Sequence, residues 1–180
     1  QSYIDEARFL MNLSHPFIAP YYGFSYKVPF VFLSENNFSS TLYDAINDEK
    51  NKKTFTGTEK TTIAIVIACC MKYLHSINIV NYDLCSHNIY LYDNDYPKLA
   101  NFSTHPYAYY FPNSSENKKN EINQWTPPEL YEENSPSPKT DVYSFGIILW
   151  ELLTEKCPFP DVNPSEFVLQ IGKGNERPPI

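Results

Sequence analysis

The feature that most constrains the fold is a helix predicted over residues 141–153, because it is apolar on almost every side. Its apolar side chains include Phe145, Ile147, Ile148, Leu149 and Leu152. A helix of this kind is stable only where other elements surround it. The chain has 180 residues, of which 42% are hydrophobic, so it can supply such a core. We expect Thr140 to be the N-cap of this helix.

The rest of the chain mixes helices with a few short strands. Apolar residues at three- and four-residue steps predict helices, and β-rich runs between turn residues predict strands. The expected helices are 3–13, 42–47, 58–76 with Thr58 as N-cap, and one that opens at Asn163; the expected strands are 21–26, 30–33, 89–92 and 97–100. The stretch 104–123 shows no period, which is typical of a functional or mobile loop. The fold class is therefore α+β.

Charge and cysteine usage exclude several functions. The net charge of −7 argues against a nucleic-acid binder, which normally carries a basic surface. The longest apolar run, 63–71, is too short to cross a bilayer, and no secretion leader opens the chain. The four cysteines form no CxxC pair and the four histidines are scattered, which argues against a zinc site. Free thiols indicate a reducing compartment, so we expect a cytoplasmic location.

Three segments carry specific motifs. The first is Asn81-Tyr-Asp-Leu-Cys-Ser-His-Asn88, and the second is Lys98-Leu-Ala-Asn-Phe-Ser103. The third is Trp125-Thr-Pro-Pro-Glu129, with Asp141-Val-Tyr-Ser-Phe-Gly146 beginning twelve residues after the glutamate. In this order and spacing they resemble the catalytic loop, the DFG segment, the APE segment and the central helix of a eukaryotic protein kinase. The Ser-x-Asn and Trp-x-x-Pro-Glu spellings resemble the tyrosine-kinase-like branch.

The resemblance covers nearly the whole chain and implies a bilobal fold. Residues 1–33 would form part of the small lobe, 34–40 the hinge, and 41–180 part of the large lobe, with an activation segment at 101–129. The glycine-rich loop and the third-strand lysine of a kinase do not appear in this sequence, nor do the last helices of the large lobe. We therefore expect an incomplete kinase-like domain, truncated at both ends, with apolar surface exposed at the two cuts.

The resemblance also implies site residues. Asp83 would accept the proton of the substrate hydroxyl, and Asn88 would hold a magnesium ion. Glu6 corresponds to the glutamate that pairs with the missing lysine. The remaining nucleotide-binding positions would be the hinge residues Ser34, Glu35 and Asn37, the adenine floor Tyr90, and the DFG position Asn101.

Several of these positions depart from the kinase pattern. Asn101 replaces the aspartate that binds magnesium, and an uncharged amide is a weak ligand for a hard cation. Cys85 replaces a lysine that would neutralise the transferred phosphoryl group, and Tyr82 replaces an arginine that would bind an activation-loop phosphate. Asn81 replaces the histidine that packs under the DFG phenylalanine, Phe102.

The positions that serve the fold are retained. Phe102 remains in the DFG segment, Glu129 is placed for the ion pair that anchors the activation segment, and Asp141 is placed to hold the catalytic-loop backbone. Strand alternation puts Tyr90 on the face opposite Ile89 and Leu91. Tyr90 either lies flat under a bound adenine or fills the pocket, and the sequence leaves both possibilities open.

Three functions compete. The first hypothesis is a pseudokinase, a catalytically impaired domain that acts on protein partners as a scaffold or allosteric regulator in signalling. The second is an active but atypical serine/threonine kinase that uses ATP and Mg²⁺, with Asn101 as a weak metal ligand and a protein as substrate. The third is an interaction module whose cleft is filled by side chains such as Tyr90 and which needs no cofactor.

Overall fold

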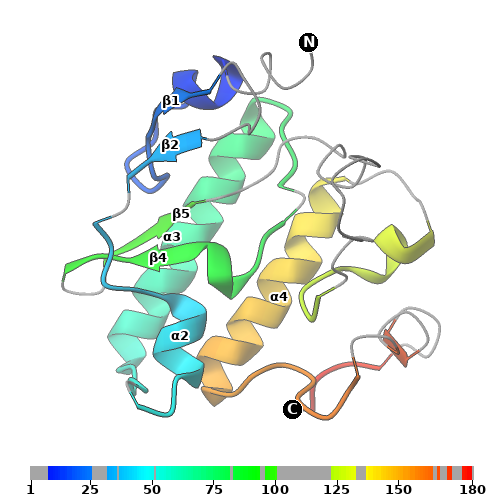
Figure 1. Ribbon diagram of the computed structural model, residues 1–180. Helices are drawn as coiled ribbons and strands as arrows, with labels where there is room; N and C mark the ends of the chain where they lie inside the picture. The colour runs from blue at the N-terminus through cyan, green and yellow to red at the C-terminus, as the bar shows by residue number, and fades with distance from the viewer. Residues whose placement is uncertain are drawn as a thin grey trace.

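The computed structural model describes residues 8–25, 32–35, 37–50, 52–81, 83–93, 96–100, 123–132, 137–163, 166, 170–171 and 176–179. Residues 8–12 are helical and lie beside a small sheet at one end of the molecule (Figure 1). Two long helices, α3 (Gly57–Ser76) and α4 (Pro138–Thr154), run through the rest of the molecule. The strands β4 (Ile89–Leu91) and β5 (Pro97–Leu99) and the helix α2 (Leu42–Asn47) lie in front of α3 in this view (Figure 1). The observed elements are α+β, as expected.

The helix α3 begins slightly earlier in the chain than expected. Its N-cap is Thr56, so the assignment of Thr58 as the cap is wrong. The Thr56 hydroxyl accepts the Glu59 N–H at 3.3 Å, and the Glu59 carboxylate accepts the Thr56 N–H at 2.7 Å. These reciprocal bonds form a capping box, which needs a glutamate three residues after the cap. Thr58 has no such partner, and this spacing decides where the helix begins.

The helix α4 also begins earlier than expected. Ser137 is the N-cap and Pro138 occupies the first turn, so the assignment of Thr140 as the cap is wrong. Thr140 instead completes a capping box, because its hydroxyl accepts the Ser137 N–H at 3.1 Å. The sequence analysis expected α4 to be buried on almost every side, but only one side of this helix is buried. Val142 is 58% and Leu153 is 72% exposed, so one apolar edge of α4 faces solvent.

Two small antiparallel sheets carry the strands. The first pairs β1 (Tyr21–Phe24) with β2 (Phe32–Ser34), which confirms the expected hairpin partners. The second has the order β3-β4-β5 and consists of β3 (Ser40–Thr41), β4 (Ile89–Leu91) and β5 (Pro97–Leu99). The sequence analysis did not find β3, because a two-residue strand has no measurable alternation.

The middle strand β4 separates two apolar clusters. Ile89 and Leu91 pack into the main core together with α3 and α4. Tyr90 points to the opposite face and packs with Ala19 and Ala100. This arrangement confirms the expected alternation along the strand.

Two short 3-10 helices complete the described fold: η1 (Ser86–Asn88) and η4 (Pro128–Glu132). Residues 104–122 of the predicted loop and most of the helix expected from Asn163 lie outside the described residues. Within the described part of the chain, no helix combines the length and apolar character needed to span a membrane.

Candidate functional site

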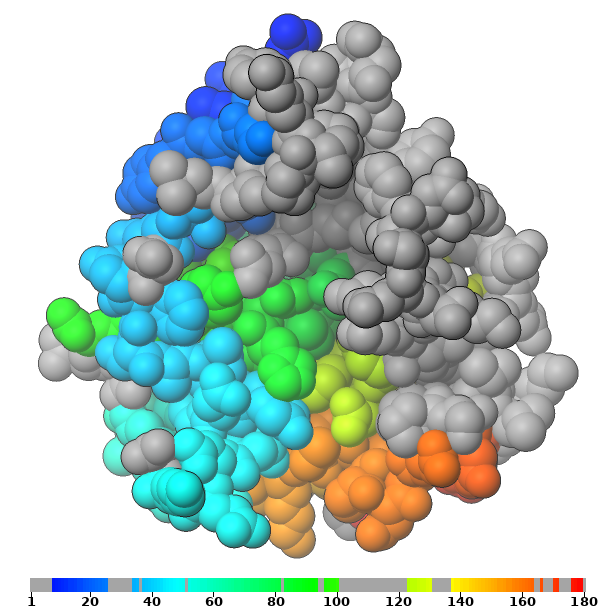
Figure 2. Space-filling view, viewed as in Figure 1, coloured from blue at the N-terminus to red at the C-terminus, as the bar shows by residue number. Residues whose placement is uncertain are grey.

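The segment between α3 and β4 brings Asp83 and Asn88 together. The Asn88 side-chain amide donates to the Asp83 carboxylate and to the Asp83 carbonyl, both at 2.9 Å. The 3-10 turn η1 makes this contact possible, because the Asn88 N–H donates to the Cys85 carbonyl at 3.0 Å and folds the chain back. In Figure 2 the green residues of this segment lie between the cyan residues of the N-terminal half and the segment 123–132.

The third side chain beside Asp83 is the thiol of Cys85. The Cys85 sulfur lies 4.0 Å from the Asp83 carboxylate, and its side chain is buried. Burial raises the pKa of this thiol far above its ordinary value, and the nearby Asp83 raises it further. The thiol is therefore neutral at physiological pH. The Asn88 amide and the Cys85 thiol both donate to the Asp83 carboxylate, and neither donor carries a charge.

The carboxylate of Asp141 holds the start of the same segment. The Asn81 N–H donates to Asp141 Oδ2 at 3.0 Å, and His75 Nε2 donates to the same oxygen at 2.6 Å. Asp141 is completely buried, and this burial raises its pKa while the two donors act in the opposite direction. Its position in the first turn of α4 is favourable for a negative charge, because the helix dipole is positive there.

A second buried carboxylate, Glu151 of α4, joins three other parts of the fold. Ser86 Oγ and Asn47 Nδ2 donate to Glu151 Oε1 at 3.0 and 3.3 Å. Trp125 Nε1 donates to Glu151 Oε2 at 3.1 Å. Burial raises the pKa of Glu151 to about 7, although the three hydrogen bonds oppose the shift. We call these four residues the Glu151 network.

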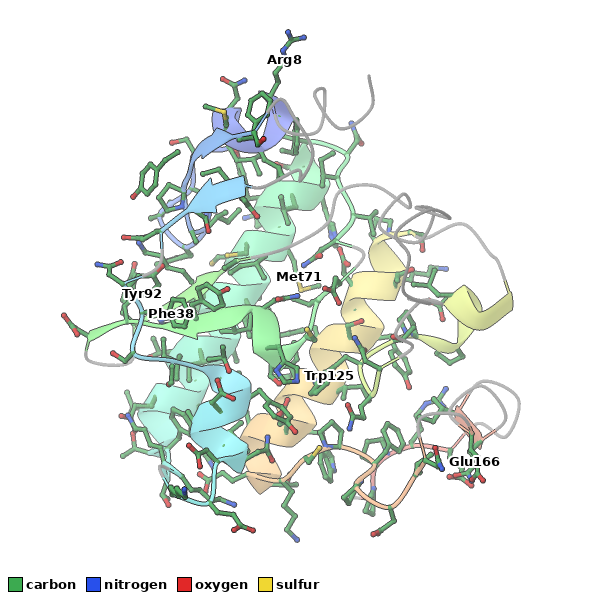
Figure 3. All side chains as sticks on the ribbon, viewed as in Figure 1. Arg8, Phe38, Met71, Tyr92, Trp125 and Glu166 are labelled. Atoms are coloured by element: carbon green, nitrogen blue, oxygen red, sulfur yellow. The ribbon has the colours of Figure 1, made fainter. Side chains whose placement is uncertain are left out.

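Aromatic rings cover the Glu151 network. The His87 ring stacks on Tyr43 with 3.8 Å between centroids, and Trp125 meets both rings edge-on. Figure 3 shows Trp125 beside η1 and α4. Trp125 is itself held by the Ser144 hydroxyl, which donates to its carbonyl at 2.9 Å. The segment that contains Asp83 is thus attached to α2, to α4 and to the segment after residue 122.

Tyr90 lies in a second part of the candidate site. Its ring stacks on Phe38, with 3.9 Å between the centroids and 28° between the planes. Tyr90 is buried and Phe38 is half-buried. Phe38 follows the expected hinge residues, and sequence analysis did not identify it.

The hinge residues occupy different environments. Ser34 ends β2 opposite Tyr21, and Asn37 is exposed. The Glu35 carboxylate accepts Lys98 Nζ at 2.6 Å, and the same amine lies over the Tyr92 ring. Glu35 is therefore paired with a cation from β5.

Other predicted residues cannot be placed. Glu6, Tyr82, Asn101 and Phe102 lie outside the described residues. Glu129 lies half-buried in η4. Its role in an ion pair that anchors the activation segment remains a prediction.

The donor set fits magnesium poorly. Magnesium prefers carboxylate oxygens in near-ideal octahedral geometry. At the described part of the site the amide oxygen of Asn88 accompanies one carboxylate, Asp83, which already accepts the Asn88 amide. Across the described residues, no three His, Cys, Asp or Glu side chains gather closely enough to hold a metal ion.

Glu151 is the main residue that sequence analysis missed. The available signal was one carboxylate within an otherwise apolar helix, at a position one residue before the buried Leu152. A charged residue at such a position requires hydrogen-bond donors. Its donors come from distant segments, and therefore the sequence alone does not identify them.

Comparison with known proteins assigns the family. The family model for protein tyrosine and serine/threonine kinases matches residues 1–180. Serine/threonine/tyrosine-protein kinase HT1 of Arabidopsis thaliana is 31% identical over 181 residues, covering 100% of this chain and 46% of HT1. Serine/threonine-protein kinase TNNI3K of Mus musculus is 28% identical over 180 residues, covering 97% of this chain and 21% of the relative. Tyrosine-protein kinase csk-1 of Caenorhabditis elegans is 30% identical over 175 residues, covering 96% of this chain and 32% of csk-1.

The chain thus spans less than half the length of these relatives. They include kinases named for serine/threonine and for tyrosine, which agrees with the resemblance to the tyrosine-kinase-like branch. The family match extends over the whole chain, and the α+β arrangement of small sheets and helices is consistent with it. This chain belongs to the protein tyrosine and serine/threonine kinase family.

Proposed function

We propose that this chain is the kinase-like domain of a pseudokinase, which regulates protein partners in signalling as a scaffold or allosteric element. In this proposal residues 1–33 belong to the small lobe, 34–40 form the hinge, and 41–180 belong to the large lobe. The observation that carries the proposal is the neutral Cys85 thiol beside the Asp83 carboxylate. Phosphoryl transfer requires cations that neutralise charge developing on the phosphate oxygens.

The contrast between chemistry and scaffold supports this proposal. Asp141 holds the start of the segment that contains Asp83, and Glu151 holds its middle at Ser86, through buried hydrogen bonds. These contacts shape the loop and need no nucleotide. A scaffold or allosteric regulator needs the shape of a kinase domain more than the charges that catalysis requires. The hydrogen bonds to Asp141 and Glu151 maintain that shape around Asp83.

The alternative function is an active, atypical serine/threonine kinase that uses ATP and Mg²⁺. The hydrogen bond between Asn88 and Asp83 favours it, because the presumed base and metal ligand still meet at 2.9 Å. Asn88 and Asn101 would then bind the metal, while Asp83 accepts the proton of the substrate hydroxyl.

Free cysteines support a reducing, cytoplasmic location for either function. All four thiols, Cys69, Cys70, Cys85 and Cys157, are free in the structure. Disulfides are rare in the reduced interior of cells, where signalling kinases act.

The experiment is a phosphotransfer assay on the full-length protein with ATP and Mg²⁺, using autophosphorylation and a general protein substrate as readouts. The Asp83→Asn variant is the matched control, because it removes the presumed base and keeps the side-chain volume. We expect wild type and variant to give the same background signal. Transfer by the wild type that disappears in Asp83→Asn would refute the pseudokinase proposal and establish the alternative.

A further inference from the structure

The face of β4 that points away from the main core carries an aromatic platform, formed by Tyr90 and the residues packed on it. Tyr90 faces away from the main core and packs with the buried side chains of Ala19 and Ala100. Ala19 precedes β1 and Ala100 follows β5, so the platform lies where the two small sheets meet. Small side chains on either side of an aromatic ring leave room for a second flat ring.

Phe38 supplies that second ring. Its centroid is 3.9 Å from that of Tyr90 and its plane is tilted by 28°, which is a stacked arrangement. Figure 3 shows Phe38 and Tyr92 close to each other at one end of the three-stranded sheet. A planar ligand that stacked on the same face of Tyr90 would meet Phe38.

The backbone on the C-terminal side of Phe38 fixes the ring in this place. The Ser39 N–H donates to the Leu91 carbonyl at 2.7 Å, and Thr41 pairs with Tyr90 across the strands. These contacts attach residues 39–41 to β4 immediately beside Tyr90. The backbone next to Phe38 is therefore held by the sheet, and this keeps the Phe38 ring close to Tyr90.

We propose that Phe38 occupies the stacking position over Tyr90 that the planar base of a nucleoside would take, and that its removal opens a nucleoside site. This inference rests on the proposed function, because it explains how a kinase-like domain excludes the nucleotide base. The inference also favours one of the two possibilities for Tyr90. Tyr90 would lie flat as a floor that can accept a planar base, and Phe38 would be the ring that fills the space above it.

The test measures binding of adenosine without magnesium to the full-length protein by isothermal titration calorimetry. Adenosine carries no phosphate, so the measurement is independent of charge neutralisation at Asp83. The variants are Phe38→Ala, the double variant Phe38→Ala/Tyr90→Ala, and Tyr96→Ala as a control. Tyr96 is a matched control because its exposed ring contacts another aromatic ring, Phe17, away from the platform. Phe38→Val, which is smaller than phenylalanine and cannot stack, replaces Phe38→Ala if the latter melts early.

We expect wild type and Tyr96→Ala to show no saturable binding at millimolar adenosine. Phe38→Ala should bind at least about tenfold more tightly than wild type, which corresponds to about 1.4 kcal/mol. The double variant should lose this gain. The inference is wrong if wild type binds as tightly as the Phe38 variant, or if neither Phe38 variant gains affinity.

The two proposals can fail separately. Phosphate transfer by the wild type refutes the pseudokinase function, whatever adenosine does. Unchanged adenosine affinity in the Phe38 variants, combined with no phosphate transfer, refutes only the role of Phe38.

Discussion

The buried carboxyl of Glu151 should make the stability of the fold fall as the pH rises. The folded chain holds its proton up to a pKa of about 7, compared with an ordinary value of 4.5. Between these two values the folded state binds more protons than the unfolded state, so the free energy of unfolding decreases with pH. The difference corresponds to about 3 kcal/mol, lost between roughly pH 4.5 and 7 and constant above that. Because Glu151 is fully buried, solvent screening does not reduce this value.

The variant Glu151→Gln isolates this contribution. Its amide oxygen can accept the Trp125 N–H, and its amide nitrogen can donate to the Ser86 hydroxyl. The Asn47 amide, which donates to Glu151 at 3.3 Å, then faces another donor. At pH 5, where the wild-type carboxyl is protonated, we expect the variant to be less stable by about 1–3 kcal/mol. At pH 8 this deficit should shrink by about 3 kcal/mol, so the variant should equal or exceed the wild type.

The assay is urea unfolding at pH 5, 6, 7 and 8, followed by tryptophan fluorescence. The useful quantity is the difference in unfolding free energy between wild type and Glu151→Gln at each pH. Burial lowers the pKa of His87 from its ordinary value, and the contribution of His87 to both proteins is subtracted in the difference. Glu49→Gln is the control, since this side chain is exposed. The difference in unfolding free energy between wild type and Glu49→Gln should be the same at every pH. A difference between wild type and Glu151→Gln that stays constant from pH 5 to 8 would refute the reasoning.

Other contacts give sharper local predictions. Thr56→Ala should lower the unfolding free energy by about 1 kcal/mol through loss of the α3 cap, whereas Thr58→Ala should change it far less in the same urea titration. Brief alkylation of the native protein with iodoacetamide should label the partly exposed Cys69 before the buried Cys85, and mass spectrometry of peptides would show the reverse order if the packing were wrong. Asp141→Ala should cost about 3–5 kcal/mol in thermal or urea unfolding, because the buried Asn81 N–H and the partly buried His75 ring lose their acceptor; a loss below about 1 kcal/mol would contradict that.

Residues close in sequence were predictable, because local geometry brings them together. Asp83 and Asn88 lie in one tight turn, and the resemblance of that short segment to a kinase catalytic loop identified both residues. The alternation of β4 likewise placed Tyr90 on the correct face. The helix caps were misplaced by a few residues because neighbouring hydroxyl residues compete, and the spacing of Thr56 to Glu59 separates them.

Contacts between distant segments could not be predicted in the same way. Glu151 meets Asn47 across 104 positions and Ser86 across 65, and no local pattern encodes either partner. Phe38 was invisible for the same reason, since its stacking partner Tyr90 belongs to another strand. A buried carboxylate indicates that donors exist but does not identify them.

The shape of the loop around Asp83 is held by hydrogen bonds between protein groups. Its first residue is held by Asp141, its middle by Glu151, and its last by Asp83 itself. None of these bonds involves a phosphate or a metal ion. In the proposed pseudokinase, Cys85 stands where the kinase resemblance implies a lysine, and the buried site accepts the neutral thiol without a penalty for charge. Because the core maintains the loop geometry, we expect that a domain of this kind would keep the surface of a kinase after losing phosphotransfer.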